Sequence, residues 1–233
     1  MNRREFLLVV PGVALAGCAS VGGGSGPSVP APMLRVGDRW VYNCSDGYRN
    51  PVTWVETHQV VAIDGGGISV RVTLVGATMN YDRVERWQAP GIVLTGSIYD
   101  DAINRTFKAP YVRYQFPLTP GGAWRQTVRY PNPDNQLESN VSRTVHVGGY
   151  ESVTTPGGTF NALVMRSFMN VDNNSPFYWP TQCDYVTWYA PEVGAKVKET
   201  KYATDQERGD DMGMAIRAQN TVIELASYSK GNG

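Results

Sequence analysis

Asp64-Gly65-Gly66-Gly67, followed by Ile68-Ser69-Val70-Arg71-Val72-Thr73-Leu74, indicates a tight turn that leads into a β-strand. Apolar residues occupy every second position after the turn, with polar residues between them. This two-residue period is typical of a strand with one buried face. Residues 52–63, before the turn, are rich in Val, Thr and Trp. We expect them to form the hairpin partner of this strand.

The same alternation recurs along the chain. Residues 39–43 predict another strand, with Trp40, Tyr42 and Cys44 on one face. Further strands are expected at residues 123–130, 140–147, 160–168, 184–189, 195–202 and 221–228. The sequence has no long apolar stripe with helical spacing. It therefore predicts an all-β domain, an antiparallel meander that forms a curved sheet, a sandwich or an open barrel.

Two motifs occur twice and in the same order. Gly37-Asp38-Arg39-Trp40 is followed later by Gly121-Gly122-Ala123-Trp124, and Trp87-Gln88-Ala89-Pro90 by Trp188-Tyr189-Ala190-Pro191. The repetition favours a duplicated domain, whose halves cover about residues 34–118 and 119–230. Coincidence is the alternative, because Trp residues and Gly-Pro turns recur in any β-rich chain.

The start of the chain has the layout of an export signal. Arg3-Arg4 precede a short apolar run, residues 7–15, and small residues follow it. The end of this run, Leu15-Ala16-Gly17-Cys18, resembles the lipobox of bacterial lipoproteins. The resemblance implies that residues 1–17 are a signal peptide and that Cys18 becomes an N-terminus carrying acyl chains such as palmitate. An ordinary signal peptide with an incidental cysteine is the alternative.

The residues around this signal bear on the export route and the destination. Asn2-Arg3-Arg4-Glu5-Phe6-Leu7 resembles the twin-arginine consensus, although the usual Ser or Thr before the arginines is missing. Two arginines are equally typical of an ordinary basic start. Ala19 follows the cysteine, which resembles the outer-membrane sorting choice of lipoproteins. We therefore expect a chain anchored by lipid in the bacterial cell envelope, at the outer membrane and facing the periplasm.

Composition separates a tether from the folded domain. Residues 18–33 are rich in Gly, Ser and Pro and are expected to be a flexible tether, with one all-β domain over residues 34–230. Export places Cys44 and Cys183 in an oxidising compartment, where they are predicted to form a disulfide. Two separate buried thiols are the alternative. The chain has 21 basic and 21 acidic side chains, so nucleic acid is not an expected partner.

The C-terminal third carries the densest signature. It contains Gly149-Tyr150-Glu151-Ser152-Val153, Pro156-Gly157-Gly158-Thr159-Phe160-Asn161-Ala162, and Trp188-Tyr189-Ala190-Pro191-Glu192-Val193-Gly194-Ala195-Lys196-Val197-Lys198. These motifs resemble those of a family of uncharacterised bacterial exported proteins and lipoproteins. The resemblance implies an all-β exported domain, and it brings no catalytic residues to this chain.

No motif favours catalysis or a metal site. His58 and His146 are the only histidines, and each stands alone in a strand pattern, whereas a zinc site needs three or four ligands. The pair Asp100-Asp101 falls in a predicted loop, where a solvated charge is the ordinary role. The sequence has no Gly-x-Ser-x-Gly motif. We therefore expect a protein that is not an enzyme and needs neither a metal nor a cofactor.

Aromatic residues supply the remaining functional hypothesis. Those that gather near Pro-rich segments are Tyr111, Tyr114, Phe116, Phe177, Tyr178 and Trp179. They are candidate ligand-binding residues, and ordinary packing in a β protein is the alternative. The leading hypothesis is a non-catalytic envelope lipoprotein that binds a hydrophobic ligand, such as a lipid, or an envelope protein partner. The second is a carbohydrate-binding protein or hydrolase that uses the aromatic loops.

Overall fold

The computed structural model describes residues 25–99, 103–133, 135–172, 174–209 and 215–232. The predicted signal peptide and Cys18 lie outside the described residues. Twelve strands are found in the described part of the chain: β1 (Arg39–Asp46), β2 (Val52–Asp64), β3 (Gly67–Gly76), β4 (Asn80–Ala89), β5 (Ile92–Gly96), β6 (Arg105–Val112), β7 (Ala123–Pro131), β8 (Glu138–Thr155), β9 (Gly158–Val171), β10 (Thr181–Ala190), β11 (Ala195–Gln206) and β12 (Ala215–Ser229). No helix in these residues has the length and hydropathy needed to cross a membrane.

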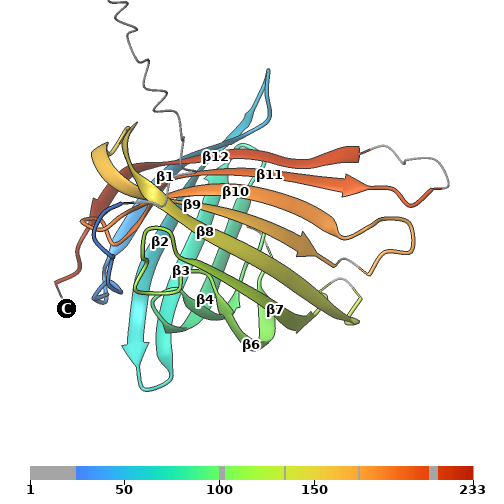
Figure 1. Ribbon diagram of the computed structural model, residues 1–233, viewed down its shortest axis with the longest axis horizontal. Coiled ribbons are helices and arrows are strands. Elements are labelled where there is room, and N and C mark those ends of the chain that lie inside the picture. The colour runs from blue at the N-terminus through green and yellow to red at the C-terminus, as the bar shows by residue number, and fades with distance from the viewer. Residues whose placement is uncertain (1–24, 100–102, 134, 173, 210–214, 233) are drawn as a thin grey trace, which may run out of the picture.

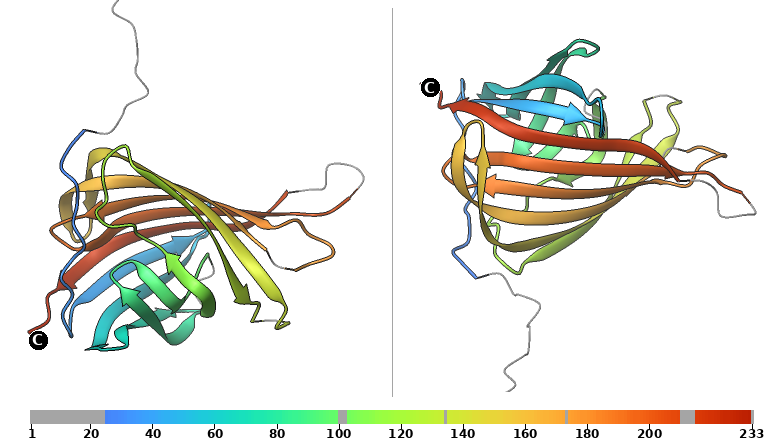
Figure 2. Two further views of the ribbon diagram at one scale, coloured as in Figure 1. Left: turned by 60° about the horizontal axis from the view of Figure 1, so that its bottom comes forward. Right: turned by 90° about the horizontal axis from the view of Figure 1, so that it is seen from above.

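All twelve strands belong to one antiparallel sheet, in the order β6-β5-β4-β3-β2-β1-β12-β11-β10-β9-β8-β7. Strands that follow one another in the chain are neighbours, except that β6 and β7 form the two ends of the sheet and β1 pairs with β12. The sheet curls so that it nearly closes into a barrel, and β6 and β7 approach one another (Figures 1 and 2). The predicted all-β antiparallel meander is confirmed, in its barrel form.

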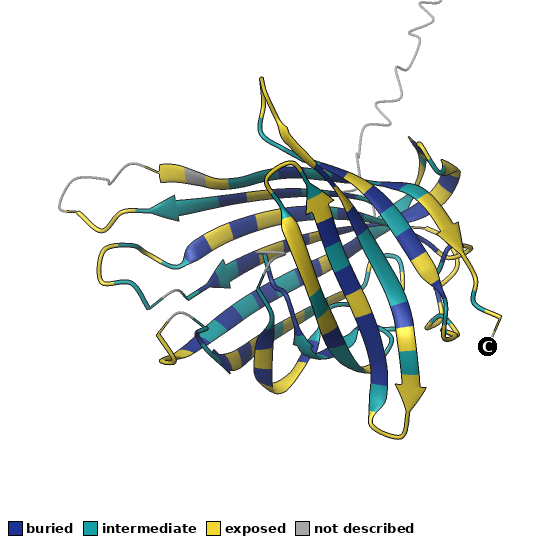
Figure 3. Cartoon of the chain, turned by 180° about the vertical axis from the view of Figure 1, so that it is seen from behind, coloured by how far each residue is buried: buried dark blue, intermediate teal, exposed yellow. Residues whose placement is uncertain are grey.

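Alternation along the strands determines which side chains face the interior. Val70, Val72 and Leu74 of β3 are buried, and so are Trp40 and Tyr42 of β1, as their spacing predicts. Figure 3 shows the same alternation of buried and exposed positions across the barrel wall. The interior holds three clusters of apolar side chains. Burial of these clusters supplies the main favourable free energy of folding.

The two halves of the chain are equivalent in topology. Each half is a meander of six strands, β1 to β6 and β7 to β12. Trp40 and Trp124 are both the second residue of the first strand in their half. Trp87 and Trp188 both lie near the end of the fourth strand. The repeated motifs thus fall on equivalent strands of the two meanders.

Part of the predicted tether belongs to the folded domain. Residues 25–37, here called the N-terminal segment, run along the barrel. Val29 is buried and forms an isolated β-bridge with Leu118. The hydroxyl of Tyr150 donates a hydrogen bond of 2.9 Å to the carbonyl of Pro27. The domain therefore begins before residue 34, because an apolar side chain at Val29 finds a buried position that composition alone did not reveal.

The predicted disulfide is not formed. Cys44 and Cys183 are both buried without a disulfide, and they belong to different apolar clusters. β1 and β10 are separated by β12 and β11 in the sheet. Neighbouring strands lie about 4.8 Å apart, so three such spacings separate the backbones of β1 and β10 along the sheet. A disulfide allows only roughly 7 Å between the two Cα atoms. The two cysteines pack as small apolar side chains.

Candidate binding cavity

The interior of the barrel contains a cavity of about 100 Å³. Pro32 and Leu34 of the N-terminal segment line it, together with residues of the β4–β5 and β10–β11 turns. Its wall is unusually rich in charge for a protein interior. The carboxylates that line it are Glu56, Glu85 and Glu199, and the basic side chains are His58, Arg83, Arg113, Arg143, Lys196 and Lys201.

Glu85 on β4 is the centre of a buried ionic cluster near the two ends of the sheet. Its Oε1 is 2.6 Å from the Arg83 guanidinium, and its Oε2 is 3.0 Å from that of Arg113. The indole N–H of Trp87 donates a third hydrogen bond of 2.7 Å. Arg113 immediately follows β6, so Glu85 fixes the end of this edge strand from the inside. These donors satisfy the hydrogen-bonding capacity of the Glu85 carboxylate, which has almost no contact with solvent.

A second cluster joins strands on either side of the β1–β12 pair. Lys196 on β11 lies 2.8 Å from Glu199 and 4.0 Å from Glu56 on β2. Glu56 also contacts His58 at 2.5 Å, and Lys201 lies 3.8 Å from Glu199. Glu199 is thus shared by two ammonium groups, in the same way that Glu85 is shared by two guanidinium groups.

These charges keep the carboxylates ionised. Burial alone would raise the pKa of Glu85, but the guanidinium groups of Arg113 and Arg83 outweigh burial and hold the pKa well below its usual range. The pKa of Glu199 is lowered to about 2, because Lys196 and Lys201 outweigh the opposing effect of burial. Lys196 and His58 likewise lower the pKa of Glu56 against burial. All three carboxylates therefore carry a negative charge at neutral pH.

Several buried polar atoms of the cavity wall have no hydrogen-bond partner. They are the Oε2 of Glu56, the Nε of Arg143 and the hydroxyl of Tyr189. Arg143 also forms no ion pair with any described residue, although its other nitrogens donate to the carbonyl of Arg113 and to Ser167. Buried polar groups in native proteins nearly always have a partner, and a water or ligand often supplies it.

Side chains close the gap between β6 and β7. The amide of Gln126 on β7 accepts a 2.9 Å hydrogen bond from the N–H of Val112 and donates one of 2.7 Å to its carbonyl. Gln126 thereby takes the role that a backbone neighbour has elsewhere in the sheet. Arg143 on β8 donates to the carbonyl of Arg113 at 3.0 Å. We call this junction, formed by Val112, Arg113, Gln126 and Arg143, the seam.

Two solved structures resemble this chain. One is a proposed exported protein with a YmcC-like fold from Bacteroides fragilis NCTC 9343, with a TM-score of 0.51 and 16% identity. The other is a proposed lipoprotein from Parabacteroides distasonis ATCC 8503, with a TM-score of 0.55 and 14% identity. Each match covers 88% of this chain and 100% of the other. The chain shares its fold with these proteins. No protein-family model and no curated protein sequence matches it.

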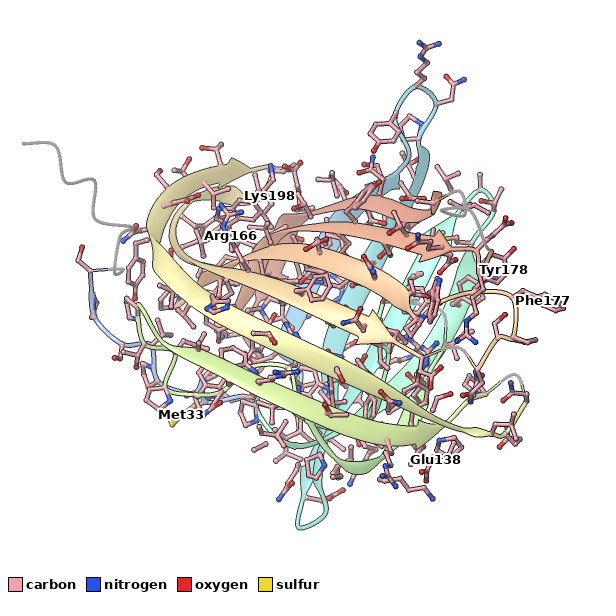
Figure 4. All side chains as sticks on the ribbon, turned by 45° about the vertical axis from the view of Figure 1, so that its right-hand side comes forward. Met33, Glu138, Arg166, Phe177, Tyr178 and Lys198 are labelled. Atoms are coloured by element: carbon pink, nitrogen blue, oxygen red, sulfur yellow. The ribbon has the colours of Figure 1, made fainter. Side chains whose placement is uncertain are left out.

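The six aromatic residues predicted as a ligand site divide into two groups. Tyr111, Tyr114 and Phe116 line the cavity. The β9–β10 loop carries the other three, and the exposed fractions of Phe177 and Trp179 are 72% and 50%. Figure 4 shows Phe177 and Tyr178 at the opposite end of the molecule from Met33. The structure therefore brings only the first group together with the charged residues.

Sequence reasoning missed the charged wall of the cavity. Glu85 and Arg83 precede Trp87 at two-residue intervals on β4, so they share its inward face. Extending the alternation backwards from Trp87 would have revealed them. Polar residues in an alternating strand ordinarily face solvent, but Arg83 and Glu85 face the interior. Among the described residues, no group of three or more His, Cys, Asp or Glu side chains is placed to hold a metal ion.

Proposed function

We propose that this chain is an exported lipoprotein that is held in the envelope through Cys18 and binds a small polar ligand inside its barrel. One observation carries the ligand part of the proposal. The cavity is lined in part by ionised side chains, and three buried polar atoms of its lining residues lack a partner among the described residues. Such atoms cost free energy unless a bound molecule satisfies them.

The anchor rests on the first residues of the chain. Leu15-Ala16-Gly17-Cys18 has the pattern of a lipidation site, and Ala19 favours the outer membrane. The fold is shared with a proposed exported protein and a proposed lipoprotein, which supports the same destination. The N-terminal segment, which leads from the anchor, contributes Pro32 and Leu34 to the cavity wall. The cavity would therefore lie on the side of the domain nearest the membrane.

The size and polarity of the cavity favour a small polar ligand over a lipid tail. An engineered cavity of about 150 Å³ holds one benzene molecule, and that cavity is entirely apolar. The cavity of this chain is smaller, at about 100 Å³, and charged groups line it together with aromatic and aliphatic side chains. A hydrophobic chain could not satisfy the buried polar atoms that lack a partner, whereas a small polar ligand could. A protein partner is the remaining form of the binding hypothesis, and the exposed Phe177 and Trp179 are where it would be sought.

We propose binding without catalysis because the buried carboxylates are poor proton acceptors. A general base works best with a pKa near the working pH. The pKa values of Glu56, Glu85 and Glu199 are all lowered by the cations beside them. In the aromatic loop, the Arg208 guanidinium lies 4.7 Å from the centre of the Trp179 ring and covers one of its faces. Phe177 of the same loop stays exposed, so the carbohydrate alternative would rest on this ring.

The anchor and the binding role can be tested on the same protein. Wild-type chain and Cys18→Ser are expressed in a diderm host and fractionated, with Cys44→Ala as a matched control. We expect acylated wild type and control in the membrane fraction, and an unacylated Cys18→Ser outside it. Native mass spectrometry of the mature wild type should show an added small-molecule mass. Membrane retention of Cys18→Ser, or an intact mass without acyl groups for the wild type, would contradict the anchor.

A further inference from the structure

We propose that the cavity is a binding site for a small dianionic oxyanion of the phosphate type, with Arg143 as its principal ligand. This inference rests on the proposed binding function and names the chemical class of the ligand. It follows from the charge balance of the cavity wall, from the unsatisfied donors and from the space available.

The charges that line the cavity do not cancel. Three arginines and two lysines line it, against three carboxylates. Among the described lining residues, basic groups therefore outnumber acidic ones, and His58, which pairs with Glu56, is a further basic group. Lys196 keeps its proton, since Glu199 and Glu56 hold its pKa above the usual range against the effect of burial. An excess of positive charge in a protein interior is costly, and a bound anion would lower that cost.

Arg143 is the cation that the protein leaves uncompensated. Its exposed fraction is 6%, and it forms no ion pair with any described residue. Two of its nitrogens donate to backbone and hydroxyl oxygens, and its Nε has no partner. A guanidinium group binds phosphate well, because its planar N–H donors match the geometry of the phosphate oxygens.

Two other groups of the cavity wall have no hydrogen-bond partner. Tyr189 is one of the lining residues, and its hydroxyl is buried without a partner among the described residues. Burial raises its pKa, so the hydroxyl keeps its proton. Glu56 offers the complementary group, a carboxylate Oε2 without a donor. Hydrogenphosphate has one P–OH group that can donate to this oxygen, whereas sulfate has no proton at neutral pH.

The test is titration calorimetry of the mature lipidated protein in neutral detergent at pH 7.5, with ionic strength held constant by NaCl. Inorganic phosphate should bind saturably with one site and raise the melting temperature, and sulfate should bind more weakly. Arg143→Lys keeps the charge but loses the planar donors, so its affinity for phosphate should fall at least tenfold. Arg129→Gln removes an exposed cation of the next strand and should leave the affinity unchanged. Because Arg143→Lys keeps a cation at this position, the variant is expected to fold and the measurement stays possible.

The source of the phosphate group is distinguished by competition. Glycerol 3-phosphate represents a free metabolite, and dihexanoyl phosphatidic acid below its micellar concentration represents a lipid headgroup. The compound that displaces inorganic phosphate at the lower concentration identifies the source of the phosphate group. Absence of saturable phosphate binding to the wild type, or equal affinity in Arg143→Lys, would overturn the inference. If a neutral or cationic molecule co-purifies instead, the inference fails while the proposed binding function stands. If no ligand of any class binds, both fail.

Discussion

The two halves of the chain meet at two places, and these places are built differently. At one, β1 and β12 pair along the whole of β1 through backbone hydrogen bonds, with one shift of register. At the other, the seam, Gln126 and Arg143 bridge β6, β7 and β8 through their side chains. An ionic cluster lies inside each junction, that of Glu199 at the first and that of Glu85 at the second. The barrel is therefore held by a continuous ladder on one side and by a few side chains on the other.

This difference shows where the interior is most easily altered. A ladder spreads its stability over many hydrogen bonds, so one substitution removes a small share. The seam depends on specific side chains, and two of its members, Arg113 and Arg143, also line the cavity. We infer that a change in the seam side chains alters the seam and the cavity together. The β1–β12 ladder also borders the cavity through Trp40 and Tyr42, but it is held by backbone hydrogen bonds and should respond less.

Acidification should produce the largest effect. Because the pKa values of Glu56, Glu85 and Glu199 are lowered in the folded state, their contribution to stability is complete above the unfolded pKa of about 4.3. It is lost as the pH falls toward the folded values, which is about 2 for Glu199. The free energy of unfolding, measured in urea, should drop by several kcal/mol between pH 5 and pH 3. Stability that stays constant over this interval would contradict the role given to the buried carboxylates.

Glu85→Gln should be the most damaging single substitution. It leaves Arg83 and Arg113 without their carboxylate in a buried site, at a cost of about 3–5 kcal/mol. Hydrogen exchange at the Val112 amide should also accelerate, because Arg113 no longer fixes the end of β6. Glu199→Gln is the matched variant at the other junction. Glu199→Gln should also lose stability. Amides of the β1–β12 ladder should then exchange only through global unfolding, with no added local opening. Local opening of the same size at both junctions would contradict the difference between them.

Gln126→Ala should have an intermediate effect at the seam. The variant loses both hydrogen bonds to Val112 and should be destabilised by about 1–3 kcal/mol in chemical denaturation. Gln182→Ala serves as the control, because Gln182 lies exposed on β10, between two paired strands. That variant should differ from the wild type by no more than about 0.5 kcal/mol. Equal losses in the two variants would mean that the Gln126 amide does not hold the seam.

A substitution at the end of the β1–β12 ladder should have the smallest effect. Asp46 accepts hydrogen bonds from the Asn220 N–H at 2.6 Å and from the Thr221 hydroxyl at 3.2 Å. Asp46→Ala should cost only about 1 kcal/mol, because the backbone ladder remains in place. The melting temperature should fall less than in Gln126→Ala, and a larger fall would reverse the proposed ranking of the two junctions.

Local sequence predicted β1 to β3, β7 to β12 and the buried face of β3, because a two-residue period depends only on neighbouring positions. It did not predict β4, β5 or β6. Three of its candidate ligand-binding residues, Tyr111, Tyr114 and Phe116, lie in the cavity wall. It could not pair Glu56 with Lys196 or join Gln126 to Val112, since these contacts depend on how distant strands meet across the interior. The disulfide prediction failed for the same reason, because an even number of cysteines says nothing about the strands that separate them.

Hydrogen exchange of the mature protein with and without inorganic phosphate tests the central claim most directly. If the anion occupies the cavity beside Arg143, exchange should slow around Val112 and in the middle of β8. It should remain unchanged in the β1–β12 ladder. Exchange that is the same with and without phosphate, or that slows equally at both junctions, would contradict the claim that the charged cavity and the seam form one binding unit.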